Sequence, residues 1–355
     1  MDDDNDWRDA AVVDTHAHIG WTYDFYNRAL GYYGLDGRNG RILSIVNLSR
    51  DFANAFWVPP PFGPEGTGVV AFGEIEGEPL VALDVVAHEL THGVIHYAVS
   101  NRTGSDLVDN LRIAARLGPA SFVDQDGVTR ECATTRFETF DANFEPVMAP
   151  ALCIGGRFVL GSSQAGAIHE AYADIMAEAT AFFHRDDAGT ESDYLQGSDE
   201  EAVGVIRSMR DPNSLNDPAA YGQRYEFALI DGVFGWDFSD AVFVGGQYVG
   251  STGFGGYGGN HWNSLILSHA YYLAIEGGTN TATGLTVAGA GATNRLQVEQ
   301  IFFRALAVLM PAETSLPQAA DAIRQSAADV ASGTVVQQAV EDALRAVGLA
   351  AGTTT

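Results

Sequence analysis

The sequence contains no lysine, so all 19 of its basic residues are arginines, set against 46 acidic residues. The formal net charge of −27 argues against binding to nucleic acid or to an anionic membrane, since both attract positively charged surfaces. An acidic chain without lysine is compatible with a high-salt habitat, and a GC-rich genome would equally favour arginine. We therefore expect neither a nucleic-acid partner nor a membrane partner.

Long apolar runs are also missing, and none approaches the roughly 20 residues that a membrane-spanning helix needs. The first residues, Met1–Asp4, are acidic where a secretory signal would be basic. Two expectations remain open: a cytoplasmic protein, or a secreted one whose leader and pro-segment are not present in this chain.

Cysteine is scarce too, because Cys132 and Cys153 are the only two. They could form one disulfide in an exported protein or remain two buried thiols.

The sequence does contain the segment His88-Glu89-Leu90-Thr91-His92, which matches His-Glu-x-x-His. On a helix, His88 and His92 share a face and can bind one metal ion, and Glu89 can reach a water on that metal. The alternative is a buried amphipathic helix with two structural histidines. Burying two imidazoles beside a carboxylate is costly without an ion or hydrogen bonds, which favours the metal. His96 lies about 12 Å from His88 along such a helix, so it is interpreted as structural.

A second predicted helix, Ala165–Met176, places Glu170 and Asp174 four residues apart and therefore on one face. Two aligned acids are usually solvated, unless a partner helix brings cations or a metal to them. Further along, a glycine-rich stretch leads to His261 at the start of another predicted helix. His261 could be a binding residue or an ordinary exposed histidine.

The segment Asp14-Thr15-His16-Ala17-His18 suggests a different fold, because His-x-His after a first strand is typical of metal-dependent amidohydrolase barrels. A barrel requires regular alternation of strands and helices, which does not follow here. His16 and His18 are therefore interpreted as structural. The apolar spacing instead predicts helices over 22–30, 83–99, 106–117, 295–309, 316–330 and 334–347, with strands over 41–47, 51–57 and 69–73.

Together these segments resemble the thermolysin-like family of zinc metallopeptidases, from about Val13 to Leu349. The resemblance rests on the following segments of this sequence: Asp14–His16, Tyr23–Tyr26, Asn54–Trp57, Asp84–His92, Gly166–Ile168, Glu170–Ala171, Asp174–Ile175, Ile206–Met209, Asp211–Pro212, Gly259 with His261, and Ile301–Leu306. It implies an α+β fold of two lobes. Residues 1–82 would form a small β-containing N-terminal lobe with the family's N-terminal sheet truncated, and 83–99 the central zinc helix. Residues 100–160 would be an inserted segment, and 161–355 a mostly helical C-terminal lobe.

The same resemblance implies roles for individual residues. His88, His92 and Glu170 would bind Zn²⁺, Glu89 would be the general base, and His261 would stabilise the oxyanion. Asp174 would orient His88. Three residues would bind substrate: Asn54, the backbone of Ala55, and Arg207, which would contact a peptide carbonyl beside the S1′ pocket. Asp84 and Asp193 would be candidate Ca²⁺ ligands, although Ala181, Leu195 and Ser198 stand where acids are expected.

Three departures from the family pattern accompany these matches. His92 and Glu170 are 78 residues apart, much further than in the family, and this distance defines the insertion. The family's oxyanion tyrosine corresponds to Gly161, and its histidine-orienting aspartate corresponds to Gly256. Since Cys132 and Cys153 are the only cysteines of the long inserted segment, we predict that a disulfide joins them.

The implied function is that of a secreted, monomeric zinc endopeptidase, acting on a peptide or protein substrate before bulky hydrophobic residues. One alternative is a zinc-binding relative that is catalytically weak or inactive and acts as a binding protein. The other is an oligopeptidase whose inserted segment restricts the cleft to short substrates.

Overall fold

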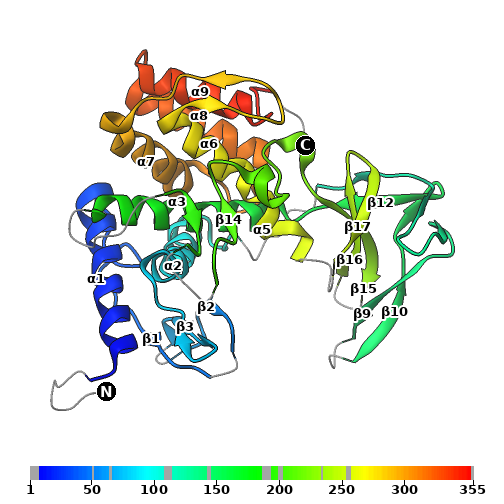
Figure 1. The fold of residues 1–355 in the computed structure, drawn as a ribbon, viewed down its shortest axis with the longest axis horizontal. Coiled ribbons are helices and arrows are strands. Elements are labelled where there is room, and N and C mark those ends of the chain that lie inside the picture. The colour runs from blue at the N-terminus through cyan, green and yellow to red at the C-terminus, as the bar shows by residue number, and fades with distance from the viewer. Residues whose placement is uncertain are drawn as a thin grey trace.

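The structure is a computed structural model, and it describes residues 8–49, 52–63, 66–107, 114–141, 145–185, 193–198, 203–232, 235–252 and 257–352. It has the predicted α+β fold: a small N-terminal lobe, two central helices, a helical C-terminal part and a sheet to one side (Figure 1). No helix among the described residues is both long and apolar enough to cross a bilayer.

The N-terminal lobe combines one long helix with a three-stranded sheet. Helix α1 (Ala10–Leu30) begins where the side chain of Asp9 accepts hydrogen bonds from the first backbone N–H groups of the helix. It starts well before the predicted residue 22 and therefore includes His16 and His18. Nδ1 of His18 lies 2.7 Å from the carbonyl oxygen of Val81, which agrees with a structural role.

The sheet of this lobe has the order β1-β3-β2, so β2 lies at an edge. Its strands are β1 (Ser44–Ile45), β2 (Ala55–Val58) and β3 (Val69–Phe72), and a small hairpin, β4 (Glu74–Ile75) and β5 (Glu78–Pro79), follows them. Strand β2 pairs antiparallel with β3. The first two strands are shorter than predicted, while β3 agrees with its prediction.

Two long helices form the centre of the molecule. Helix α2 (Leu83–Thr103) ends at Gly104, whose φ of 82° is a left-handed conformation that glycine adopts without steric cost. Helix α3 (Gln164–Phe183) packs against it, and most of its side chains are buried. Because α2 and α3 are enclosed by the other elements, polar side chains between them are held away from water.

The helical part covers α3 and continues to the C-terminus. It contains α5 (Asn260–Asn263), α6 (Leu265–Glu276), α7 (Arg295–Arg304) followed by a π turn (Ala305–Leu309), α8 (Leu316–Ala331) and α9 (Val335–Ala346). Short elements connect them: β13 (Leu195–Gln196), β14 (Arg207–Ser208), 3₁₀ turns at Pro212–Leu215, Tyr221–Gln223 and Ala292–Asn294, β18 (Gly278–Thr279) and β19 (Thr286–Val287). The three predicted C-terminal helices are all present.

A second sheet lies beside the helices (Figure 1) and joins two distant parts of the chain. Its strands are β6 (Arg116–Leu117), β11 (Cys153–Ile154), β12 (Arg157–Gly161), β15 (Glu226–Gly232), β16 (Gly235–Val244) and β17 (Gln247–Ser251), in the order β11-β12-β15-β16-β17 with β6 also paired to β12. Two hairpins lie beside them: β7 (Ser121–Val123) with β8 (Thr129–Glu131), and β9 (Arg136–Phe140) with β10 (Pro146–Pro150). We call residues 116–161 and 226–251 the β module.

The β module has an apolar core of its own, in which Phe122, Phe158 and Phe243 are in contact. Cys132 belongs to this core and forms a disulfide with Cys153, which packs against the core and lies 21 residues away in sequence. The helix predicted over 106–117 is wrong at both of its described ends, because Asp106 and Leu107 are not helical and Arg116 and Leu117 form β6. Residues 108–113 of that prediction lie outside the described part. The inserted segment is thus part of a sheet that it shares with a later stretch of the chain.

Candidate metal centre

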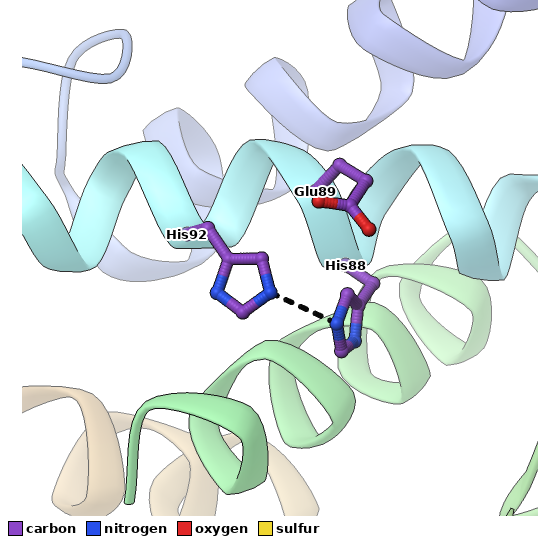
Figure 2. Close-up of side chains that lie close together, drawn as sticks. All are labelled: His88, Glu89 and His92. Carbon is purple, nitrogen blue, oxygen red and sulfur yellow. Dashed lines mark hydrogen bonds between the residues drawn. The ribbon is translucent and has the colours of Figure 1, made fainter. Parts of the chain in front are cut away.

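The side chains of the candidate metal centre come from α2 and α3. His88 and His92 lie one turn apart on α2 and point toward α3 (Figure 2), and their Nε2 atoms are 3.0 Å apart. Glu170 on α3 completes the group. Its Oε2 lies 3.4 Å from Nε2 of His88, and its Oε1 lies 3.9 Å from Nε2 of His92.

These separations fit a metal ion of the size of zinc. A tetrahedral zinc with bonds near 2.1 Å holds its donor atoms about 3.4 Å apart. Nδ1 of His88 lies 2.8 Å from Oδ1 of Asp174, so once the imidazole gives up one proton to bind a metal, the remaining proton belongs on Nδ1 and the lone pair on Nε2. That lone pair faces His92 and the Glu170 carboxylate. A cation between them would accept the lone pairs of the donor atoms and balance the charge of the carboxylate. Two imidazoles and one carboxylate leave a fourth position open, as in catalytic rather than structural zinc sites.

The electrostatics of the group also suit a cation. Burial favours the neutral acid form of Glu170, but the positive charges of the neighbouring histidines hold its pKa well below the usual range. Burial, only partly opposed by the charge of Glu170, keeps the pKa of His92 well below its usual value. Burial disfavours protonated His88 as well, yet hydrogen bonds to Asp174 and Glu170 outweigh it and raise its pKa to about 10. The Glu170 carboxylate is thus stable in its ionised form despite burial, and a carboxylate must be ionised to bind a metal.

Glu89 lies beside the donor atoms of His88 and His92 but is not one of the three proposed ligands. Its carboxylate and the two imidazoles on α2 have ligand atoms within 4.8 Å of one another, further apart than the donor atoms of His88 and His92 (Figure 2). Burial raises the pKa of Glu89 to about 7, against the opposing charge of His88. Such a carboxylate can exchange a proton with a group held between it and the metal.

Arg207 on β14 pairs with Asp174 rather than reaching toward open space. Its Nε and Nη2 donate to the two carboxylate oxygens of Asp174, each at 2.7 Å. Asp174 is fully buried, and 11% of the Arg207 side chain is exposed. Through Asp174, Arg207 is linked to His88. Contact between Arg207 and a substrate carbonyl remains a prediction.

The side of the centre that opens to solvent carries His261. This residue lies on α5 with 48% of its side chain exposed, and its Nε2 is 3.6 Å from Oε1 of Glu170. Asn54 and Ala55 lie at β2, the edge strand of the N-terminal sheet. Asn54 is exposed, and its Oδ1 accepts a hydrogen bond of 3.0 Å from the Ala55 N–H.

The candidate calcium ligands have other partners in this structure. Oδ2 of Asp84 accepts a hydrogen bond of 2.7 Å from the N–H of Gly197, and Oδ1 of Asp193 accepts one of 2.9 Å from the N–H of Leu195. Among the described residues, neither Asp84 nor Asp193 belongs to a group of three or more metal-ligating side chains whose ligand atoms lie within 4.8 Å of one another. Most of the acidic residues over 186–201 lie outside the described part, so a role of Asp84 and Asp193 in calcium binding remains a prediction.

Gly161 and Gly256 stand where the family resemblance places a tyrosine and an aspartate, and only Gly161 lies among the described residues. Gly161 is buried at the end of β12, where its backbone pairs with Phe227 of β15. Gly256 lies outside the described residues. Residue 161 therefore takes part in the sheet through its backbone and has no side chain that could contact a substrate.

Three residues close to the centre were not identified from the sequence. Nδ1 of His169 lies 2.6 Å from Nδ1 of His92, and Oδ2 of Asp106 lies 2.5 Å from Nδ1 of His96. Asp217 is buried, and burial raises its pKa to about 7 although Arg207 is nearby. His169 could have been suspected because it precedes Glu170 in the sequence. No local pattern marks Asp106 or Asp217.

Two family models match this chain. The catalytic domain of thermolysin metallopeptidases matches residues 1–96, and their α-helical domain matches residues 161–349. The two matched ranges leave residues 97–160 between them.

Individual relatives are more distant. Bacillolysin of Bacillus caldolyticus and thermolysin of Alicyclobacillus acidocaldarius subsp. acidocaldarius are each 28% identical over 350 residues, which covers 96% of this chain and 46% of the relative. Neutral protease B of Bacillus subtilis (strain 168) is 27% identical, covering 97% of this chain and 46% of the relative. The chain thus spans about half the length of these curated relatives.

A solved structure shows the same fold. The precursor of protealysin, a metalloproteinase from Serratia proteamaculans, superposes with a TM-score of 0.56 at 21% identity, covering 98% of this chain and 81% of that one. The two matched domains together cover most of the sequence, including the central helix α2 and the helix α3 that bear the candidate ligands. The chain therefore belongs to the thermolysin family of metallopeptidases, which use Zn²⁺ and Ca²⁺.

Proposed function

We propose that this protein is a zinc-dependent endopeptidase that hydrolyses peptide bonds in a peptide or protein substrate. The observation that carries the proposal is the convergence of the donor atoms of His88, His92 and Glu170 at separations that suit zinc, with Glu89 beside them. These three residues would hold the ion. Zinc there would supply a Lewis acid that polarises a water and the scissile carbonyl.

The chain's own residues would handle the protons and the charge. Glu89 would take the proton of the attacking water and pass it to the departing amine, which requires a base near the donor atoms but not among them. His261 would donate a hydrogen bond to the carbonyl oxygen as that atom gains negative charge. Its half-exposed position at the open side of the centre supports this role.

The edge strand β2 supports a proposal for substrate binding. An extended peptide can pair with the free edge of a sheet through main-chain hydrogen bonds. Asn54 and the backbone of Ala55 would make such bonds here, and Arg207 would contact a substrate carbonyl while it holds Asp174. By family resemblance we propose cleavage on the N-terminal side of bulky hydrophobic residues.

We propose further that the protein is a secreted monomer with Zn²⁺, and with Ca²⁺ bound through Asp84 and Asp193. The disulfide between Cys132 and Cys153 supports secretion, because disulfides persist in oxidising compartments. The net charge of −27 supports the absence of nucleic-acid and anionic-membrane partners.

The test is hydrolysis of unfolded casein and of short peptides, with and without a zinc chelator, followed by addition of zinc. We expect both substrates to be cleaved, the chelator to abolish cleavage, and zinc to restore it. Cleavage of short peptides alone would favour the oligopeptidase alternative. A protein that holds zinc and cleaves neither substrate would contradict the proposal and favour a binding protein.

A further inference from the structure

His261 lies in α5, a four-residue helix between the central helix α3 and the β module (Figure 1). Its proposed role depends on its place, because Nε2 of His261 must stay close to the metal centre, where it lies 3.6 Å from Oε1 of Glu170. Helix ends fray, so a side chain in the first turn of a helical stretch is held less firmly than one in the middle. The contacts of the residues on either side of His261 therefore decide how well it is held.

The chain enters α5 through a narrow space. Gly258 and Gly259 are buried there and have φ values of 67° and 74°, which glycine adopts without steric cost. A Cβ atom at position 258 would lie 2.6 Å from the Phe238 ring and 2.9 Å from Cβ of Ser163. A Cβ atom at position 259 would lie 2.9 Å from the Phe227 ring. The entry is thus enclosed by the start of α3 and by two aromatic side chains of the β module.

The residues that follow His261 are attached to the same part of the β module. The ring of Trp262 stacks on that of Phe227, with centroids 6.3 Å apart and planes inclined by 16°, and Phe227 is fully buried. Asn263 is buried as well. Its side chain accepts a hydrogen bond of 2.8 Å from the N–H of Tyr225 and donates one of 2.9 Å to the carbonyl oxygen of Tyr225. The chain is therefore held against the start of β15 both before and after His261.

Strand β15 is also joined to the segment that leads to Glu170. The backbone of Phe227 pairs with Gly161 at the end of β12, shortly before α3 begins. Phe227 thus contacts the turn of His261 through its side chain and the start of α3 through its backbone. The family resemblance places the aspartate that orients the histidine at position 256, where this chain has glycine. The support that His261 receives from β15 is a different one.

We propose that the β module positions His261: the Phe227 ring holds the chain before it and the Trp262 ring after it, and the pairing of β15 with β12 sets the distance to Glu170. Phe227 and Trp262 are positioning residues, because they act through His261 and not on the substrate. The inference rests on the proposed function and deepens it, since it names what holds the group that would stabilise the oxyanion.

The contacts suggest variants that loosen the turn without touching the metal centre. Phe227→Leu removes the aromatic face and stays apolar. Trp262→Ala removes the stacked ring from a half-buried position, and Trp262→Phe keeps a ring there. Phe243→Leu is the matched control, because Phe243 is a fully buried phenylalanine of the next strand, β16, that packs in the core of the β module against Phe122 and Tyr248.

The first measurement is hydrogen exchange of residues 257–264 in the metal-free full chain, followed by mass spectrometry. We expect Phe227→Leu and Trp262→Ala to speed exchange of these amides by about 10-fold, because they weaken the contacts that oppose local opening. Trp262→Phe and Phe243→Leu should exchange like the wild type in this segment. Thermal unfolding of all variants checks that they fold, and Phe227→Leu leaves the sequence of the measured segment unchanged.

The second measurement is the kinetics of peptide hydrolysis. We expect Trp262→Ala to lower kcat by up to about 100-fold, because a misplacement of about 1 Å suffices for such a loss. The KM and the zinc content should stay close to those of the wild type, and Trp262→Phe should restore most of kcat. In the His261→Ala background, Trp262→Ala should have no further effect on kcat if the two residues act as one unit.

Three results would overturn the proposal. Exchange in Phe227→Leu no faster than in Phe243→Leu would show that the β module does not restrain the turn. Faster exchange with an unchanged kcat would show that this restraint does not place His261. An undiminished effect of Trp262→Ala in the His261→Ala background would show that Trp262 acts elsewhere. A wild type that cleaves no peptide would contradict the proposed function instead, and the exchange measurement would still decide whether the β module holds the turn.

Discussion

Arg207 and Asp174 are joined by two parallel hydrogen bonds of 2.7 Å each, and the same carboxylate lies 2.8 Å from Nδ1 of His88. Asp174 is fully buried, and Arg207 provides the cation that makes its ionised form stable there. The pair therefore keeps a negative charge behind a metal-facing imidazole. This geometry fixes both the orientation and the protonated nitrogen of His88.

We expect Asp174→Asn to weaken zinc binding about 10–100-fold, because the amide turns an N–H₂ donor toward either Arg207 or His88. Chelator competition measures the change. Asp24→Asn is the control, since Asp24 pairs with Arg28 at the surface, where such pairs contribute little. Equal zinc affinity of both variants would contradict the role of Asp174.

We expect Glu89→Gln to retain zinc and fold normally, because Glu89 lies beside the donor atoms and is not one of the three proposed ligands. Its amide cannot accept the proton of the water, so peptide hydrolysis should fall by about 10²–10⁴-fold. Metal analysis and steady-state kinetics on one preparation measure both quantities. Hydrolysis at the wild-type rate would rule out Glu89 as the base.

We expect His261→Ala to lower kcat by about 10²–10³-fold with little change in zinc content, since the variant removes one donor to the developing oxyanion. The effect could approach that of Glu89→Gln, because Gly161 offers no side chain at the position of the second donor. Measuring kcat and KM separately tests this. A change confined to KM would instead indicate that His261 only binds substrate.

We expect replacement of both Cys132 and Cys153 by serine to lower the free energy of unfolding by about 3 kcal/mol or less. The reason is that the disulfide closes a loop over 21 residues and so restricts the unfolded chain. Urea unfolding measures the loss. Alkylation of both thiols in the wild type without a reductant would show that no disulfide forms in solution.

Glu299 gives a prediction about pH that does not involve the metal. Burial raises its pKa from 4.5 to about 7, with Arg295 opposing, so between these values the native state binds more protons than the unfolded state. The contribution of Glu299 to the free energy of unfolding should therefore fall as pH rises from about 4.5 to 7. Glu299→Gln should remove this loss and be more stable than the wild type by about 1–3 kcal/mol at pH 8, with no gain at pH 4. Urea unfolding at the two pH values measures the difference, and an equal effect at both would contradict it.

The parts of the structure that could be predicted from the sequence are those with local signals. The spacing of His88 and His92 and the apolar positions around them predict α2 and its metal-facing side, and the C-terminal helices follow from the same periodicity. The family and the α+β fold are confirmed by the matched domains. These features depend on residues within a few turns of one another.

The features that were missed depend on contacts between distant segments. Strand β12 pairs with β15 and places Leu160 opposite Ala228. No local pattern in either segment indicates which strand it pairs with. The contact of His96 with Asp106 likewise depends on how the chain leaves α2. For the same reason the strand at Arg116 was predicted as helix, since its apolar spacing alone resembles a helical face.

The shared sheet has a consequence for engineering. Residues 116–161 cannot be excised as a cassette, because removal of β12 would expose the backbone edge of β15 together with Ile230 and Phe243 of the apolar core. Transplanting the β module into a relative would require two grafts, and the second would replace residues 226–251 within the matched α-helical domain. We therefore expect the two stretches to be replaceable only together.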